Sequence, residues 1–192
     1  MNSPYRILVV CTGNICRSPM GEVVLREKLA QAGIANSEVK SAAVSAEEQG
    51  NPIDSRAQLV LREAGYTVPR RSAHRATEKE LQEADLILAM TVGHAHALRR
   101  MMNEAGADLA KLHLWREYDG TAPYCPNGVF GTGGVLENLE RCRKRSRYSD
   151  FYTSDGEYDV PDPWYGGQEG FYETLTVIER GADGIITAEI NK

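Results

Sequence analysis

The stretch LVVCTGNICRSPMGE, Leu8–Glu22, joins a branched apolar run to a helix-like segment through a short polar loop. The run before the loop is typical of a buried β-strand that ends at Val10. Beyond the loop, Ser18 and Pro19 are residue types favoured at the N-cap and at the first position of a helix. The stretch therefore predicts a strand, a loop and a helix in direct succession, with Cys11 at the carboxyl end of the strand.

The loop itself has the spacing C-x5-R, from Cys11 to Arg17. Gly13 and Asn14 tolerate the positive φ angles that turn successive backbone N–H groups inward, and the positive end of the following helix dipole points to the same place. Such a cradle suits a phosphate group. Cys11 is favoured there as a thiolate nucleophile, and Arg17 offers a planar fork that can hold two phosphoryl oxygens in the transition state.

A less specific interpretation makes Cys11 a small buried side chain and Arg17 a surface charge, since C-x5-R alone occurs often by chance. The preceding strand, the turn residues within the loop and the predicted cap after it favour the catalytic interpretation. Each of them is what phosphate chemistry requires at that place.

Along the rest of the chain, short β-branched runs alternate with longer amphipathic segments. This alternation predicts an α/β fold with a parallel sheet, helices on both faces and right-handed crossovers. In such sheets ligands bind at the carboxyl ends of the strands, where Cys11 lies. Strands are expected at about Tyr5–Val10, Val39–Val44, Asp85–Met90 and Lys111–Trp115, and helices at Pro19–Ala32, Ser55–Ala64, after the Thr77 and Glu80 capping box, from Thr91 to about Met102 and at Gln168–Glu189.

The composition is that of an ordinary globular protein, and the 192 residues are expected to form a single domain. A formal net charge of −5 argues against a nucleic-acid partner held by phosphate contacts. The sequence lacks an apolar run long enough to insert into a membrane, and its polar start MNSPYR differs from a secretory signal. We therefore expect a cytoplasmic protein whose four cysteines are thiols.

Cleavage of a phosphate ester through a phosphocysteine also needs a general acid for the leaving oxygen. The segment VPDPWYGG, Val160–Gly167, offers Asp162 between two prolines, which stiffen the loop. Trp164 and Tyr165 follow as aromatic walls for a substrate ring. An ordinary Asp-Pro turn before the last helix explains the same residues equally well.

VCTGNICRSP followed late in the chain by DPWYGG resembles the low-molecular-weight protein tyrosine phosphatase family, whose phosphate loop and Asp-Pro loop carry these patterns. The resemblance implies a four-stranded parallel sheet of order 2-1-3-4 in a flavodoxin-like three-layer sandwich, with no metal or organic cofactor. It implies hydrolysis of phosphotyrosine in proteins, with inorganic phosphate as product and a tyrosine kinase as one candidate substrate. Further segments that resemble the family in the expected order are Lys40–Ser45, Gly50–Ala57 and Glu83–Met90.

The resemblance also assigns roles to individual residues. Cys11 is the nucleophile, Arg17 the phosphate clamp and Asp162 the general acid and then base. Ser18 is expected to hydrogen-bond the thiolate and help it leave, while Asn14 holds the strained loop backbone with help from Ser41. The remaining loop residues implied in phosphate binding or loop support are Thr12, Gly13, Ile15 and Cys16.

Cys16 has a further role by this resemblance. In the family, the pair that corresponds to Cys11 and Cys16 forms a reversible disulfide that protects the nucleophile from over-oxidation. The alternative is that Cys16 only packs in the core.

Two positions depart from the family pattern. Relatives often carry an aromatic residue after the second strand, where this chain has Glu47 and Glu48 and where acidic phosphopeptides are expected to be disfavoured. Many relatives also support the phosphate loop with a histidine near the third strand. Counting back from Thr77 places Arg71 at that position, whereas the local string favours His74, and the sequence leaves both open.

The resemblance does not cover the segment of about 120–158, an irregular insertion that lies directly before the Asp-Pro loop. Its first half is rich in turn residues, and VLENLERCRKRSR within it could form a short helix with a basic end. It is either a lid or docking arm for acidic partners or a solvated, tolerated segment. Its cysteines, Cys125 and Cys142, do not form a metal-binding pattern. The basic residues in question are Arg141, Arg143, Lys144, Arg145 and Arg147.

Three other functions could use the same anion-binding loop. A protein arginine phosphatase of the same fold tends to carry threonine where this chain has Ile15, which favours phosphotyrosine. A thiol-dependent arsenate reductase needs two further cysteines near the third strand, and LILAMTVGHAHAL contains none. A non-catalytic anion-binding module would not need both Cys11 and Asp162.

Overall fold

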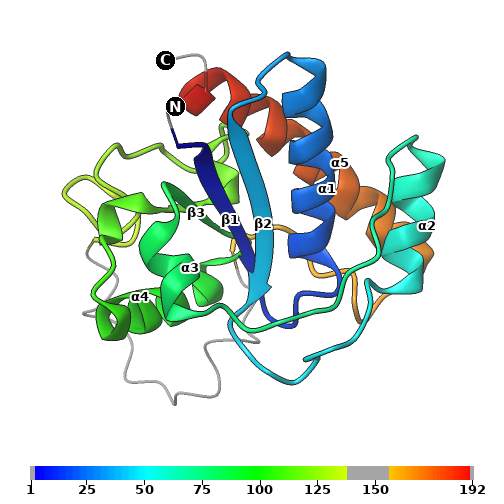
Figure 1. Ribbon diagram of the computed structural model, residues 1–192, viewed down its shortest axis with the longest axis horizontal. Coiled ribbons are helices and arrows are strands. Elements are labelled where there is room, and N and C mark those ends of the chain that lie inside the picture. The colour runs from blue at the N-terminus through cyan, green and yellow to red at the C-terminus, as the bar shows by residue number, and fades with distance from the viewer. Residues whose placement is uncertain (1–2, 138–155, 191–192) are drawn as a thin grey trace.

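The computed structural model describes residues 3–137 and 156–190 (Figure 1). Its centre is a sheet of four parallel strands in the order β2-β1-β3-β4. The predicted α/β architecture and the order 2-1-3-4 are therefore confirmed. The strands are β1 (Tyr5–Cys11), β2 (Ser37–Ala43), β3 (Leu86–Ala89) and β4 (Leu112–Leu114).

Helices cover both faces of this sheet (Figure 1). Because side chains alternate along a strand, Ile7 and Val9 of β1 join one core cluster, while Leu8 and Val10 join the other. The first cluster contains the buried faces of α1, α2 and α5, and the second contains those of α3 and α4. These helices are α1 (Arg17–Gln31), α2 (Ser55–Glu63), α3 (Glu78–Glu83), α4 (Val92–Ala105) and α5 (Gln168–Ile185), and 3-10 turns lie at Leu109–Lys111 and Trp115–Glu117.

The predicted start of the first helix is wrong. Helix α1 begins at Arg17 rather than at Pro19, and Cys16 takes the N-cap position without a side-chain hydrogen bond. Ser18 does not cap the helix, because its hydroxyl instead contacts Cys11 Sγ and the Ala42 carbonyl. The phosphate loop thus runs directly into the helix.

Two other helix ends can be compared with their sequence signals. The capping box at α3 is present, since the Glu80 N–H donates to Thr77 Oγ1 and the Thr77 N–H donates to Glu80 Oε2. The last helix ends its α-helical geometry at Ile185 and continues as a π-helix, Ile186–Ile190, about as far as the sequence predicted.

The structure describes residues 120–137 and 156–158 of the insertion, and the first of these stretches packs in part against the sheet. Val129 and Leu136 are fully buried and join the core cluster of α4. The Val129 N–H also donates to the Leu112 carbonyl at 2.8 Å, on the strand β4 that closes one edge of the sheet. The solvated alternative therefore does not apply to Val129 and Leu136, whereas other residues of the stretch, such as Pro123 and Tyr124, are exposed. The basic residues from Arg141 to Arg147, Cys142 and most of the expected helix lie outside the described residues.

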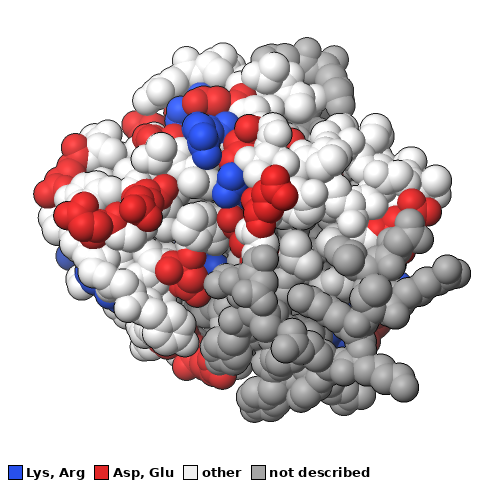
Figure 2. Space-filling view, turned by 180° about the vertical axis from the view of Figure 1, so that it is seen from behind, with Lys and Arg blue, Asp and Glu red and all other residues white. Residues whose placement is uncertain are grey.

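The charges are distributed over the surface. On the face that Figure 2 shows, acidic side chains are scattered over the described residues, and basic side chains form small groups between them. Within residues 3–137 and 156–190, the structure contains no helix that combines the length and the apolar character needed to cross a membrane.

Candidate active site

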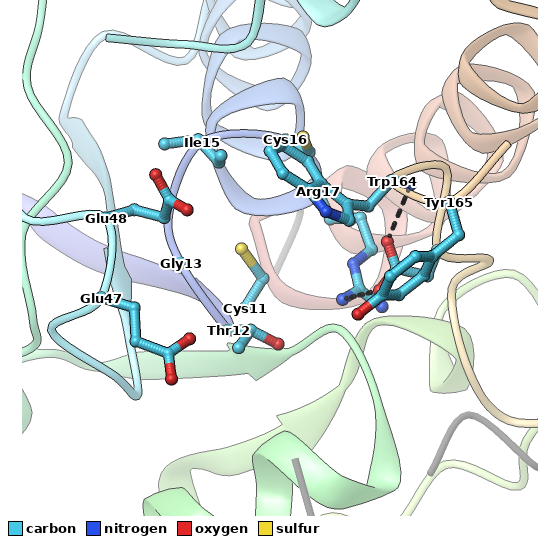
Figure 3. A pocket seen from close by; sticks show the side chains of 11 residues that line it. Cys11, Thr12, Gly13, Ile15, Cys16, Arg17, Glu47, Glu48, Trp164 and Tyr165 are labelled. Carbon is cyan, nitrogen blue, oxygen red and sulfur yellow. Dashed lines mark hydrogen bonds and ion pairs between the residues drawn. The ribbon is translucent and has the colours of Figure 1, made fainter. Parts of the chain in front are cut away.

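The phosphate loop lies at the carboxyl edge of the sheet, where β1 ends at Cys11 and α1 begins at Arg17. A pocket opens there, and Figure 3 shows the Cys11 sulfur at its centre, with Glu47 and Glu48 on one side and Trp164 and Tyr165 on the other. The loop and the Asp-Pro segment, far apart in sequence, thus meet at one site. The lining residues are Cys11, Thr12, Gly13, Ile15, Cys16, Arg17, Glu47, Glu48, Asp162, Trp164 and Tyr165.

The sulfur of Cys11 has two hydrogen-bonding neighbours from the loop and from α1. The Asn14 N–H donates to Cys11 Sγ at 3.3 Å, and the Ser18 hydroxyl lies 3.0 Å from the same sulfur. Both are placed to donate to a thiolate. Such donors stabilise negative charge on a sulfur that is removed from water, and Cys11 is only 3% exposed.

Asn14 fixes the shape of the loop. With a φ of 60°, it is the one non-glycine residue in a left-handed conformation among residues 3–137 and 156–190. Its Nδ2 donates to Ser18 Oγ and to Ser41 Oγ, both at 2.9 Å. Gly13, expected to share the positive φ, does not adopt it. A side chain there would instead meet the Glu48 side chain, because an added Cβ would lie 2.8 Å from Glu48 Cγ.

Arg71, not His74, supplies the side chain that supports the phosphate loop. Its guanidinium donates to Asn14 Oδ1 at 2.5 Å and to the carbonyls of Asn14 and Ser41, both at 3.3 Å. It also forms an ion pair at 3.6 Å with Glu22, a carboxylate that accepts a hydrogen bond from the Ser41 hydroxyl. A partly buried guanidinium with partners on several sides can hold a backbone turn rigidly.

His74 takes a different role. Only its backbone N–H reaches Asn14 Oδ1, at 3.3 Å, while its imidazole is hydrogen-bonded to Glu80 at 2.8 Å. Although burial alone raises the pKa of Glu80, hydrogen bonds from His74 and Thr77 lower it to about 2. Of the two residues that the sequence left open, Arg71 contacts the loop through its side chain and His74 only through its backbone N–H.

The candidate phosphate clamp, Arg17, and the candidate acid, Asp162, are in direct contact. Arg17 Nη2 donates to Asp162 Oδ2 at 2.9 Å, and Arg17 Nη1 donates to the Val160 carbonyl at 3.4 Å. The Val160 N–H in turn donates to the carbonyl of Met90, which follows β3. The Asp-Pro segment is therefore fixed to the sheet edge and to the clamp, and is more than a simple turn before α5.

The aromatic residues of the pocket are exposed, as a ring-binding wall requires. Trp164 is 41% and Tyr165 80% exposed, and both flank the mouth in Figure 3. Trp164 packs against a cation, because the Arg56 guanidinium carbon lies 5.4 Å from its ring centroid. This cation–π contact restricts the orientation of the indole.

Cys16 lies at the end of the loop, lines the pocket and is buried. Burial raises the pKa of its thiol, and the negative charges of Asp54, Cys11 and Asp162 raise it further. Cys16 is therefore a protonated thiol beside the candidate nucleophile. The described cysteines Cys11, Cys16 and Cys125 are all free.

His94 is a site residue that the sequence reasoning missed. Its Nε2 lies 2.7 Å from Thr12 Oγ1 in the phosphate loop, and its side chain is fully buried. Burial holds the pKa of His94 well below its usual 6.5, and the charge of Arg17 acts in the same direction. A signal was present, because a histidine three residues after a capping threonine and next to a buried strand lies at the carboxyl edge of the sheet.

Comparisons with known proteins agree with this geometry. The family model for low molecular weight phosphotyrosine protein phosphatase matches residues 6–124. The low molecular weight protein-tyrosine-phosphatase of Streptomyces coelicolor is 33% identical, over 96% of this chain and 93% of its own length. The chain belongs to this family. It is thus a low molecular weight protein-tyrosine phosphatase and a hydrolase, as the sequence predicted.

Solved structures place this phosphatase in the same fold. The crystal structure of YfkJ from Bacillus subtilis is similar with a TM-score of 0.73 at 25% identity, and covers 99% of this chain and 97% of that chain. Wzb from Vibrio vulnificus, solved in complex with benzylphosphonate, is similar with a TM-score of 0.66 at 29% identity over 93% of this phosphatase and 94% of Wzb.

Proposed function

We propose that this phosphatase hydrolyses phosphotyrosine in proteins through a phosphocysteine formed on Cys11. The observation that carries the proposal is the meeting of three groups at one pocket. The Asn14 N–H donates to Cys11 Sγ, the Ser18 hydroxyl lies 3.0 Å from the same sulfur, and the Arg17 guanidinium contacts Asp162 at 2.9 Å. A nucleophile, an anion clamp and a proton donor are the parts that phosphate-ester cleavage needs.

In the first step the phosphoryl group lies in the loop and Cys11 Sγ attacks phosphorus. A sulfur–phosphorus bond forms, and the bond between phosphorus and the tyrosine oxygen breaks. Arg17 holds phosphoryl oxygens while negative charge is redistributed among them. The proton of Asp162 passes to the leaving oxygen, so that tyrosine departs as a neutral phenol. Contact between Arg17 and Asp162 keeps this acid next to the phosphoryl group.

In the second step a water molecule attacks the phosphorus of the phosphocysteine. Asp162, now a carboxylate, takes a proton from the water, and the sulfur–phosphorus bond breaks. Cys11 leaves as a thiolate, to which the Ser18 hydroxyl donates across a contact of 3.0 Å. Inorganic phosphate departs, and the enzyme returns to its starting state.

The pocket favours an aryl phosphate. Trp164 and Tyr165 offer exposed ring faces at its mouth, and an aromatic substrate ring can stack on them. Wzb, a related structure, is in complex with benzylphosphonate, in which an aromatic ring is joined to a phosphonate group. A phenol with a pKa near 10 also leaves more readily than an alkyl alcohol.

The test is steady-state phosphate release from matched phosphotyrosine and phosphoarginine peptides. Wild type is expected to prefer the phosphotyrosine peptide, and Cys11→Ser is expected to release no phosphate above background. Cys125→Ser is the matched control, because Cys125 is also a buried free thiol but does not line the pocket. A preference for phosphoarginine, or activity that survives in Cys11→Ser, would overturn the proposal.

A further inference from the structure

The contact between His94 and Thr12 ties the first turn of α4 to the phosphate loop. His94 Nε2 and Thr12 Oγ1 are 2.7 Å apart, whereas His94 Nδ1 is buried and has no hydrogen-bond partner among the described residues. The ring cannot turn freely, since the His94 side chain is fully buried. His94 Nε2 is therefore hydrogen-bonded to the loop, whereas His94 Nδ1 has no partner among the described residues.

This asymmetry decides which group donates. A neutral imidazole carries one N–H, and full burial beside the cation of Arg17 keeps His94 neutral because both lower its pKa. If Thr12 donated to Nε2, the imidazole hydrogen would lie on Nδ1, as a buried donor without an acceptor. Buried N–H groups without an acceptor are rarer in proteins than buried acceptors without a donor, and leaving one unpaired costs free energy. The favoured tautomer has its hydrogen on Nε2 and donates it to Thr12 Oγ1.

Thr12 then has its own hydroxyl hydrogen left to donate. The residue is half-buried and lines the pocket next to Cys11 (Figure 3). We propose that His94 is a positioning residue that directs the Thr12 hydroxyl hydrogen towards the pocket, where Thr12 donates to a phosphoryl oxygen. The inference rests on the proposed function, since it adds one binding group to the same site.

The test measures binding of inorganic phosphate by calorimetry, which needs no turnover. Thr12→Val replaces the hydroxyl by a methyl group of similar size and is expected to weaken phosphate binding about tenfold, the effect of one hydrogen bond to a charged group. Thr12→Ser keeps the hydroxyl and is expected to lose less. Thr176→Val makes the same chemical change on α5, outside the pocket, and serves as the matched control for the substitution itself.

The role of His94 is tested by combining substitutions at His94 and Thr12. His94→Phe keeps a flat ring without a donor and is expected to weaken phosphate binding, and the double variant with Thr12→Val is expected to bind no more weakly than Thr12→Val alone. His94→Gln, whose amide can donate, is expected to recover part of the loss. A purely structural role would predict additive losses and no recovery.

Two results would overturn the inference: unchanged phosphate binding in Thr12→Val, or losses that add in the double variant. If His94→Phe does not fold, the comparison of Thr12→Val with Thr12→Ser still decides whether the hydroxyl binds phosphate. Equal losses in these two variants would then also count against it. A wild-type protein that binds phosphate but does not hydrolyse phosphotyrosine would instead contradict the proposed function and leave this binding test valid.

Discussion

Arg17 Nη2 and Asp162 Oδ2 are 2.9 Å apart, although 145 positions separate the two residues in the sequence. The guanidinium is only 5% exposed, whereas the carboxylate is 28% exposed. The buried partner is therefore fixed, and the Asp-Pro loop docks on it. This arrangement places the candidate acid at the edge of the phosphate site, where it can reach water and the leaving group.

Asp162→Asn is expected to lower kcat/KM on a phosphotyrosine peptide by about a hundredfold to ten-thousandfold, the usual contribution of a positioned general acid. The loss is expected to be much smaller on p-nitrophenyl phosphate, because nitrophenolate leaves without a proton. Steady-state kinetics on both substrates checks this. Asp183→Asn, an exposed carboxylate on α5, is the control. Equal losses of kcat/KM on both substrates would show that Asp162 does not act as the acid of the first step.

The sequence predicted the strand-loop-helix unit and the sheet because both depend on local patterns. The apolar run before Cys11 specifies β1 with little help from the rest of the chain. Asn14 was also expected, as a residue that tolerates positive φ, to adopt a turn conformation; that it holds the loop with Ser41 was implied by the family resemblance, and the structure shows its side chain hydrogen-bonded to Ser18 and Ser41. Residue types with narrow conformational preferences can be interpreted without knowledge of tertiary contacts.

Tertiary contacts explain what the sequence did not predict. Ser18 has the preferences of an N-cap, but the nearby Cys11 sulfur and the Ala42 carbonyl compete for its hydroxyl. Arg71 and His74 could not be ranked by counting, because their neighbours come from α1, β2 and α3. His94 was missed for the same reason, since only the folded chain brings it to Thr12.

Arg71→Ala is expected to lower kcat/KM about tenfold to a hundredfold, because Asn14 loses charged hydrogen bonds that hold its left-handed backbone. Arg71→Lys keeps the charge beside Glu22 but lacks a planar fork, so an intermediate loss is expected. Arg70→Ala, at the exposed neighbouring position, is expected to behave as wild type. Steady-state kinetics measures kcat/KM for the three variants, and thermal unfolding shows whether each is folded. An unchanged Arg71→Ala would mean that the loop holds its shape without this support.

Ser18→Ala is expected to slow the second chemical step more than the first, by about tenfold, since the departing Cys11 thiolate loses a hydroxyl donor. Rapid-mixing kinetics should then show a burst of phenol before a slower steady state. Ser41→Ala also removes a partner of Asn14 but does not touch Cys11, so it is expected to give no burst. A burst in both variants, or in neither, would contradict this role for Ser18.

Peroxide is expected to inactivate the wild type reversibly and Cys16→Ser irreversibly. Peroxide converts the Cys11 thiolate to a sulfenic acid, and the protonated Cys16 thiol then condenses with it, forming a disulfide and releasing water. Without Cys16, the sulfenic acid is exposed to further oxidation. The measurement is activity recovered with dithiothreitol, with Cys125→Ser as control. Equal recovery in Cys16→Ser and wild type would refute the proposed protection.

The pKa of His94 predicts how stability depends on pH. In the unfolded chain His94 binds a proton below about pH 6.5, but in the folded state its pKa is well below that value because of burial and the charge of Arg17. The unfolded state therefore binds more protons in this range, and the free energy of unfolding falls as pH decreases below about 6.5. The maximum slope for one proton is about 1.4 kcal/mol per pH unit.

Urea unfolding between pH 7 and pH 5 measures this slope, and His94→Phe is expected to flatten it. Glu80 does not contribute to this slope. Its folded-state pKa is about 2, so its contribution to the free energy of unfolding is lost only as pH falls below the ordinary value of 4.5. His74→Phe, at a half-buried histidine outside the pocket, is the control for loss of an imidazole. The same slope in His94→Phe and wild type would mean that other groups cause the acid sensitivity in this range.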